Sequence, residues 1–433
     1  MKTKNVTLIM LCMLLFACDK QVAYNDISNK KNNGSYVIPV NQAIDYLDAF
    51  LDADTKSEYS DRQIANIVTV MADGTMEMTK SGESYPLLYI INYTDNEGYA
   101  IISADKRIGN DVFAITESGN INENYSCYDT LNSEKLPLEL VRRYAINASS
   151  TIPIRDSLVD DNYFTFPRND DDPPEFTVPD GEWVITVWDR VETVNAVPVM
   201  LKTKWNQNAP FNNLCRPYAA GCTAVAMMQI MTYNAYPSPF IIEDVTIPFE
   251  ELREMKYVLN DSSIYAKAVA LIVKSIRDYC GVTHLGTSSL IWPKHAAKYF
   301  KNVMGYSNVQ RYADPKRCDV NMIIDCLMKG YPVFVAAKAN GFHAHSWVVD
   351  GLIYKNYYGH KEGEESGDYK GEAYKSEAYF HCNWGWGGKD DGYFKAGIFD
   401  IDISYDFDYM TKSESDGDYD SYYRIITYEV QEG

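Results

Sequence analysis

The chain has 433 residues, and 40 Lys and Arg against 60 Asp and Glu give it a formal charge of −20. Hydrophobic residues make up 46% and charged residues 23%, which is typical of a globular rather than a disordered protein. At about 100–200 residues per domain, two or three domains are expected. The negative charge argues against nucleic acid as a partner and against docking on an anionic membrane surface, because phosphates would be repelled.

Residues 1–18 are typical of a bacterial secretion signal. A short basic start precedes an apolar run over 6–17, which is too short for a permanent transmembrane helix. The run ends in LFAC, which is similar to a lipoprotein box and would place a lipid on Cys18. Plain secretion with cleavage near Ala17 is the alternative. We therefore expect export, with the chain either anchored to a bacterial membrane through Cys18 or secreted.

A polar tether is predicted over 19–35, followed by a first domain over 36–150 and a linker over 151–195 that contains a processing region. Apolar spacing in the first domain predicts one helix and an antiparallel sheet. The helix is expected over 40–51 and strands over 67–71, 85–93, 99–103 and 112–115. This domain has no concentration of catalytic residue types.

The second domain is predicted over 196–433, with helices first and strands later. Helical spacing occurs over 223–233, 264–279 and 294–302, and strand-like runs follow over 332–337, 346–350, 378–381, 393–394 and 423–428. This order predicts an α+β domain of two packed halves, with any active cleft between them.

Nine cysteines are present, and seven remain when Cys12 and Cys18 of the signal are set aside. They form no CxxC pair, so neither a disulfide scaffold nor a zinc knuckle is indicated, and an odd number leaves a free thiol. Cys222 follows Gly221 at the start of a predicted helix, where unpaired N–H groups and the helix dipole favour a thiolate. A buried structural cysteine is the alternative.

A cysteine nucleophile needs a base, and six histidines are available. His343 and His345 enter a predicted buried strand, where packing would hold an imidazole in place as a general base requires. Because they are two residues apart, both point to one face of an extended chain. A zinc ion shared by His343, His345 and His381 is therefore a weaker alternative.

Two amide side chains could complete such a site. Asn383, in an NWGWGG turn, could orient the imidazole, with the tryptophans of the turn shielding that hydrogen bond from water. Gln207, fifteen residues before Cys222, could donate to an oxyanion. The alternatives are an aromatic–glycine structural turn and an ordinary surface glutamine.

The order Gln207, Cys222, His345, Asn383 resembles the streptopain family of papain-like cysteine peptidases. The matching motifs are KWNQ ending at Gln207, GCTA around Cys222, HSWVVDG from His345 and NWGWGG from Asn383. The resemblance covers most of 196–400. The first domain, with its YIINYTDNEGYAIISADKRI segment, is similar to the propeptide that occludes the cleft in this family.

The resemblance implies a helix-plus-antiparallel-sheet propeptide and a papain-like two-lobed catalytic domain, helical half then β half. It also implies an exported cysteine endopeptidase made as a zymogen, needing no metal or cofactor. Proteins or peptides would be its substrates, and its own propeptide an intramolecular inhibitor. A catalytically silent relative that binds a protein partner through the cleft is the alternative.

The family pattern also selects His345 over His343, because the family's histidine directly precedes a small-aromatic-Val-Ile-Asp-Gly strand. It makes Cys222 the nucleophile and Gln207 the oxyanion donor. The wall that supports the histidine is then formed by Asn383, Trp384 and Trp386. Residues 354–375 depart from the pattern, where the family has a short hairpin, and they are predicted to be a surface excursion near the cleft.

Overall fold

The computed structural model describes residues 37–52, 61–72, 85–121, 136–150, 186–312, 320–338, 344–361, 375–399 and 422–430. The predicted signal, the tether and most of the linker lie outside these residues. Within them, every helix is too short or too polar to span a bilayer.

The first domain contains the predicted helix and four strands, and one helix more. The helix α1 covers Val40–Asp52, and the strands are β1 (Ile64–Met71), β2 (Pro86–Tyr93), β3 (Tyr99–Ser103) and β4 (Val112–Thr116). A short 3-10 turn, η2 (Thr94–Asn96), connects β2 and β3, which pair as a hairpin. The additional helix, α2 (Leu136–Ser150), was not predicted.

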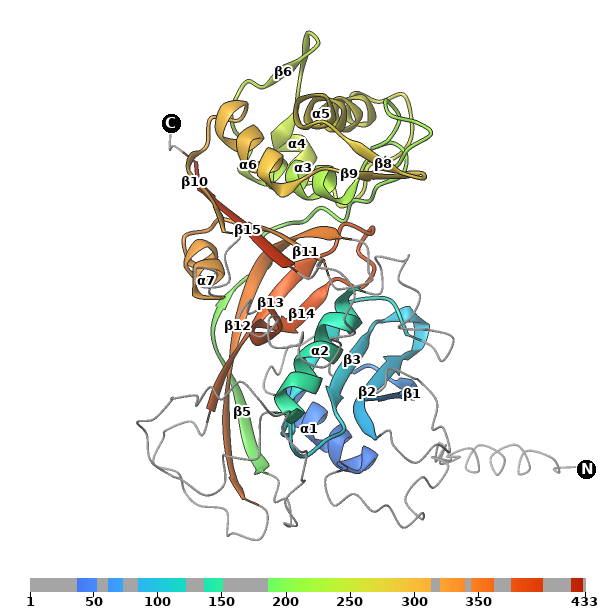
Figure 1. Cartoon of the computed structure of the whole chain (residues 1–433), viewed down its shortest axis with the longest axis vertical. Helices are drawn as coiled ribbons and strands as arrows, with labels where there is room; N and C mark the ends of the chain where they lie inside the picture. The colour runs from blue at the N-terminus through green and yellow to red at the C-terminus, as the bar shows by residue number, and fades with distance from the viewer. Residues whose placement is uncertain are drawn as a thin grey trace, which may run out of the picture. The chain divides into compact units, whose positions relative to one another are not determined.

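The helical half of the second domain is built around α3, which is buried along most of its length. The helices are α3 (Cys222–Asn234), α4 (Phe249–Arg253), α5 (Ile264–Cys280) and α6 (Pro293–Asn302), and Figure 1 shows them gathered together. Two hairpins accompany them, β6 (Ile241–Ile242) with β7 (Val245–Thr246) and β8 (Thr283–Leu285) with β9 (Ser288–Leu290). Because α3 has apolar or small residues on all sides, it packs against helices and against the sheet at once.

The sheet half follows in the chain, with one helix inserted. Its elements are β5 (Thr186–Val197), β10 (Ser307–Tyr312), α7 (Val320–Met328), β11 (Val333–Lys338), β12 (His345–Lys361), β13 (Lys375–Asn383), β14 (Gly392–Lys395), η5 (Ala396–Phe399) and β15 (Tyr422–Glu429). The predicted helix-then-strand order is confirmed for the elements after β5, which precedes the helices, while β5, β10 and α7 were not predicted.

One antiparallel sheet runs through both domains. Its order is β1-β2-β3-β4-β14-β13-β12-β11-β15-β10, and β5 pairs with β12 off this path. The two domains meet where β4 pairs with β14, with Thr116 opposite Gly392 and Ala114 opposite Phe394. The first domain therefore covers what would otherwise be an open sheet edge.

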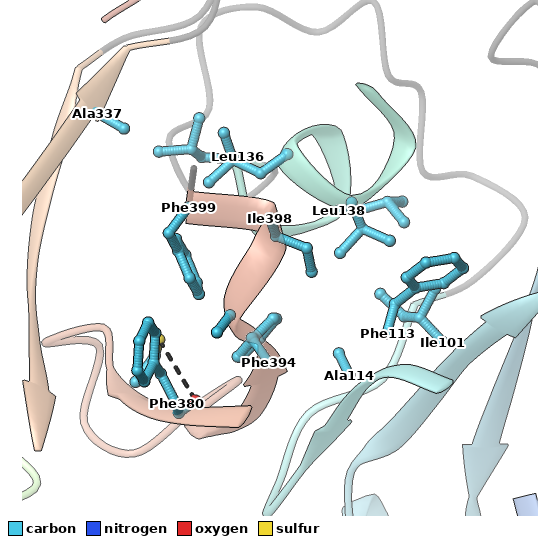
Figure 2. Packing of buried hydrophobic residues seen from close by; sticks show 14 of the residues in the cluster. Ile101, Phe113, Ala114, Leu136, Leu138, Ala337, Phe380, Phe394, Ile398 and Phe399 are labelled. Atoms are coloured by element: carbon cyan, nitrogen blue, oxygen red, sulfur yellow. Dashed lines mark hydrogen bonds between the residues drawn. The ribbon is translucent and has the colours of Figure 1, made fainter. Parts of the chain in front are cut away.

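A shared hydrophobic core lies beside that strand pair (Figure 2). Phe113 and Leu138 of the first domain pack in the same buried cluster as Phe394, Ile398 and Phe399 of the second. Removal of the first domain would expose these aromatic rings to water, which is unfavourable.

Residues 354–361 are not the predicted surface excursion near the cleft. They continue β12, and they pair on one side with β5 and on the other with the start of β13, while 362–374 lie outside the described residues. The extension contains tyrosine and lysine residues and shows no aliphatic pattern. It is nevertheless partly buried, since Tyr357 is only 2% exposed. We call β5, residues 352–361 and residues 375–380 the arm.

Candidate active site

Cys222 is the first residue of α3, and the preceding glycine makes that position possible. Gly221 has φ +98°, a conformation that L side chains rarely adopt. A Cβ atom at this position would also lie 3.0 Å from the Ser289 carbonyl oxygen. The tight approach places the start of α3 against β9, with Cys222 partly exposed.

The residues that follow Cys222 and His345 bind each other. The Thr223 and Ser346 hydroxyl oxygens are 3.0 Å apart and buried, and the Thr223 hydroxyl lies 3.1 Å from the Ile291 carbonyl oxygen. Because a carbonyl only accepts, Thr223 donates to Ile291 and Ser346 donates to Thr223. This contact joins the start of α3 to the start of β12 and brings the predicted nucleophile and base to the same junction.

The His345 ring is buried, and its two nitrogens differ. Nε2 lies 2.8 Å from the carbonyl oxygen of Trp384, while Nδ1 is buried without a hydrogen-bond partner. The carbonyl only accepts, so Nε2 carries the proton and Nδ1 keeps its lone pair. Burial lowers the pKa of His345 to about 4, which outweighs the opposite effect of the Trp384 carbonyl. The ring is therefore neutral, with Nδ1 as the basic atom.

Tryptophan rings enclose this imidazole. The centroid of the Trp386 ring lies 4.6 Å from that of His345, and those of Trp384 and Trp347 lie 6.1 and 6.4 Å away. Trp384 and Trp347 also pack against each other at 4.7 Å. The two tryptophans predicted to wall the histidine are thus beside it, and Trp347 is a third that was not singled out.

The thiol of Cys222 is not activated in this form. Burial raises its pKa above the usual value, and hydrogen bonds with Ser346 and Thr223 only partly oppose that effect. Since the only partner of the His345 ring nitrogens in the described residues is Trp384, the sulfur has no hydrogen bond to the imidazole. The predicted Cys222 thiolate therefore stays a prediction, for a form in which the imidazole reaches the sulfur.

Asn383 is buried near the site, but its amide does not bind His345. Its Nδ2 donates to the Thr203 carbonyl at 2.8 Å, and its Oδ1 accepts from Gln229 Nε2 at 3.1 Å. Gln229 in turn accepts from the Thr203 hydroxyl at 3.0 Å. Asn383 therefore joins α3, the 203 segment and the end of β13, while the Trp384 carbonyl takes the orienting position that the sequence suggested for the Asn383 amide.

Gln207 lies in a loop that is tied to both sides of the site. Its carbonyl accepts from Ala220 N at 2.9 Å, two residues before Cys222. Two residues earlier, the Trp205 carbonyl accepts from Gly387 N at 3.0 Å, in the same turn as Trp384. The backbone of Gln207 is thus held beside the nucleophile, and its side-chain role as an oxyanion donor stays a prediction.

A buried cluster of charges, which the sequence did not suggest, lies behind this turn. His381 Nδ1 is 2.6 Å from Asp350 and its Nε2 is 3.1 Å from Glu117. Lys204 Nζ is 2.8 Å from Glu117 and 3.1 Å from Asp391. Asp391 also accepts from Trp384 N at 2.8 Å, so the cluster holds the residue whose carbonyl binds His345. The sequence does contain one signal for this cluster, since the carboxylate of Asp350 lies within the otherwise apolar segment SWVVDG.

The charges in the cluster shift the pKa values of its own members. Burial alone would lower the pKa of His381, but Asp350 and Glu117 raise it to about 9. Burial would raise the pKa of Glu117, but His381 and Lys204 lower it to about 2. Around neutral pH, His381 is therefore charged and Glu117 ionised.

The zinc alternative is not supported by these contacts. Both ring nitrogens of His381 face carboxylates, Nε2 of His345 donates to a carbonyl, and His343 lies outside the described residues. In the described ranges, no three His, Cys, Asp or Glu side chains gather as metal ligands would.

Residues 117–119 of the first domain bind the turn that carries Trp384. Glu117 N donates to the Asp391 carbonyl at 2.7 Å, and the Ser118 hydroxyl donates to the Gly388 carbonyl at 2.7 Å. At Gly119 there is no room for a side chain, because a Cβ would lie 2.3 Å from Asp390 Oδ1. The first domain thus touches the back of the loop that orients the histidine.

Comparisons with known proteins agree with this arrangement. The Peptidase C10 family model matches residues 205–394, and the Spi protease inhibitor model matches residues 22–133. A search of curated proteins finds no match.

Two solved structures are similar. A fragment of prointerpain A from Prevotella intermedia is 18% identical with a TM-score of 0.50, covering 81% of this chain and 96% of that one. Active interpain A, a cysteine protease of the same organism, is 19% identical with a TM-score of 0.36, covering 53% and 94%. The first shares the fold of this chain.

The predicted family and fold class are thereby confirmed. The inhibitor match precedes the peptidase match along the chain, as in a precursor that carries its own inhibitor. The chain thus contains a domain of the Peptidase C10, or streptopain, type over residues 205–394, preceded by a propeptide domain of the Spi inhibitor type over residues 22–133.

Proposed function

We propose that the chain is a cysteine endopeptidase in its zymogen form, with Cys222 as nucleophile and His345 as base. The observation that carries this proposal is the Thr223–Ser346 contact, which places the two residues at one junction, together with the partnerless Nδ1 of His345. A buried ring nitrogen without a partner is unfavourable unless a function requires it.

In the proposed reaction, Nδ1 of His345 takes the thiol proton as the sulfur of Cys222 forms a bond to the substrate carbonyl carbon. The carbonyl π electrons move to oxygen, where the Cys222 N–H and the Gln207 side chain would donate hydrogen bonds. The intermediate collapses, the C–N bond breaks, and Nδ1 returns its proton to the leaving amine. A water molecule, deprotonated by Nδ1, then hydrolyses the thioester.

Activation would require the propeptide domain to leave. In the present form, the thiol and imidazole are neutral and not bonded to each other. Glu117 and Ser118 bind the turn that holds His345 through Trp384. Release of that turn would let the His345 ring approach the Cys222 sulfur. The prediction that the Asn383 amide orients this ring directly concerns that active form.

We further propose export, with a lipid on Cys18 or plain secretion, and a cut in the linker as the maturation step. The proposed domain limits are 1–18 for the signal, 19–35 for the tether, 36–150 for the propeptide, 151–195 for the linker and 196–433 for the catalytic domain. Protein or peptide substrates would enter the cleft between the two halves.

A catalytically silent relative is the second candidate, and the observation in its favour is that neither ring nitrogen of His345 forms a hydrogen bond with the Cys222 sulfur. Alkylation of Cys222 by iodoacetamide at pH 6, before and after propeptide removal, separates the two candidates. A peptidase should react at least about a hundred-fold faster once the propeptide has gone, and a silent protein should not change.

The main test is an intact-mass time course of the chain from Asp19 onward, under reducing conditions, beside its Cys222→Ala twin. Shortening of the wild type alone supports the proposal. If neither chain shortens, and a peptide library also stays uncut after external removal of the propeptide, the proposed activity is wrong.

A further inference from the structure

The arm carries one buried face that belongs to a core shared with the propeptide domain. Val191 of β5, Tyr357 of β12 and Tyr379 of β13 are at most 4% exposed. They pack in one cluster with α1 residues such as Leu47 and Phe50 of the propeptide domain. Figure 1 shows α1 beside the arm, and the Phe50 and Tyr379 rings are 5.1 Å apart in edge-on contact.

Polar groups of the arm also depend on the propeptide domain. The Tyr379 hydroxyl donates to the Val112 carbonyl at 2.9 Å, so the Tyr357 hydroxyl, 2.9 Å away, donates to Tyr379. Lys355, only 3% exposed, donates to the Phe50 carbonyl at 3.2 Å near the C-terminus of α1. Tyr379 and Lys355 of the arm thus donate to carbonyl groups of the propeptide domain, as expected of a surface that is complementary to a partner.

A charged contact lies beside them. Asp111 of the propeptide domain binds Lys395 at 2.5 Å and also binds Lys375 of the arm. Although burial opposes ionisation, the two lysines hold the pKa of Asp111 well below its usual range. Lys395 is 4% exposed on its side chain, so this pair is largely desolvated.

The arm is far from the nucleophile. Tyr357 is twelve residues beyond His345 on the same strand, which corresponds to about 40 Å along β12 at the usual rise per residue. A contact at the arm therefore does not act on the catalytic pair directly. It is separate from the contact of Glu117 with the turn that carries Trp384.

We propose that the arm is a second propeptide-binding surface, which keeps the propeptide domain bound to the enzyme after the linker has been cut. Its occupant is the face of this chain formed by α1, Asp111 and Val112. The inference rests on the proposed function in one respect, since retention matters only in a zymogen that is cut. It also requires cleavage before Thr186, because β5 supplies Val191 to the arm.

The experiment uses the chain from Asp19 with Cys222→Ala, cut by limited trypsin in the linker, which contains Arg155 and Arg168. Native mass spectrometry and gel filtration then follow the two fragments. Retention predicts that they migrate together and separate slowly on dilution. Asp111→Asn and Tyr379→Phe should each raise the dissociation rate at least ten-fold.

Arg190→Ala is the matched control on the same arm, because Arg190 pairs with Glu192 and lies over Tyr358, both within the arm. It should leave the dissociation rate unchanged. Glu117→Gln tests the contact at the turn.

Immediate separation of the wild-type fragments would overturn the proposal. So would faster release in Glu117→Gln alone, with Asp111→Asn and Tyr379→Phe behaving like Arg190→Ala. If Asp111→Asn does not fold, Tyr379→Phe decides. Because every protein in the experiment lacks Cys222, a failure of the proposed peptidase activity would not affect these outcomes.

Discussion

Two junctions hold the described part of the chain together, and they use different chemistry. The junction between the helical and sheet halves of the catalytic domain is made largely of neutral groups, and Lys204 and Asp391 form a buried ion pair beside them. Thr223 meets Ser346 there, and Gln229, Asn383 and Thr203 form a buried amide network. None of these neutral groups titrates in the ordinary pH range.

The junction between the propeptide and catalytic domains combines a shared apolar core with several ionised groups. Asp111 binds Lys375 and Lys395, and Glu117 binds Lys204 and His381. Ions regain their hydration when two surfaces separate, so a charged contact is easier to open than its short distances suggest. The junction that must open therefore contains more ionised groups than the permanent one, and its stability should depend more strongly on pH and salt.

The largest effect is expected from Asp111→Asn, which removes the nearer of the two carboxylates that the buried Lys395 binds, the other being Glu377 at 3.2 Å. Removing one partner of a buried pair typically costs about 3 kcal/mol or more. The zymogen should lose that amount of unfolding free energy, measured in urea, while the mature catalytic domain does not contain the residue. Asp95→Asn, at an exposed turn of the same domain, is the charge-matched control and should have no effect. A loss confined to the control would refute the role of the pair.

A smaller loss of unfolding free energy, equal in the zymogen and in the mature enzyme, is expected from Gln229→Met. The substitution keeps the length of the side chain but leaves Asn383 Oδ1 and the Thr203 hydroxyl short of a partner, at a cost of about 2 kcal/mol. Urea unfolding should show the same loss in the zymogen and the mature enzyme, and at pH 6 and pH 9. Gln310→Met, at an exposed position of β10, is the control. A loss in only one form would show that the neutral junction is not shared.

Strong apolar periodicity made much of the fold predictable from sequence. The helices α1, α3, α5 and α6 and the strands β1–β4 were expected close to where they lie. The strand β5 was assigned to the linker because its pairing partner, residues 352–361, lies far along the chain. Those residues looked like a loop for the same reason, since Tyr and Lys form a buried face only once β5 and α1 are in place.

The candidate site was predictable in its residue types and not in its contacts. Motifs pointed to Cys222, His345 and the tryptophans around them. The partner of His345, however, is the backbone carbonyl of Trp384, and every residue has such a carbonyl, so no residue type reveals it. Glu117 could not be identified from the sequence because its partners lie in the other domain.

The pH dependence of zymogen stability follows from the charged junction. The pKa of His381 is raised from 6.5 to about 9, so its contribution is complete below pH 6.5 and is lost as pH rises through about 9. The pKa of Glu117 is lowered from 4.5 to about 2, so its contribution is present above pH 4.5 and is lost as pH falls through about 2. We expect the urea midpoint to be highest between about pH 4.5 and 6.5 and to fall from pH 7 to 9.5.

Glu117→Gln is the variant that sharpens this prediction. Without that carboxylate, only Asp350 remains to raise the pKa of His381 in direct contact, so the fall between pH 7 and 9.5 should shift to lower pH. An unchanged alkaline limb in Glu117→Gln would mean that another group titrates there.

The smallest effect is expected from Lys274→Ala. This variant tests whether the ion pairs at the propeptide junction stabilise the chain because they are buried and not only because they are charged. Lys274 binds Asp278 at 2.6 Å, close to the 2.5 Å between Asp111 and Lys395, and it binds Glu243 at 3.1 Å. All three side chains are exposed, so water and salt screen the pair and the ordering of long side chains opposes it. The urea midpoint should not move in either form at 0.15 M salt. If Lys274→Ala lost as much unfolding free energy as Asp111→Asn, short ion pairs would stabilise this chain whether buried or exposed. The difference between the two junctions would then come from their charges and not from the burial of those charges.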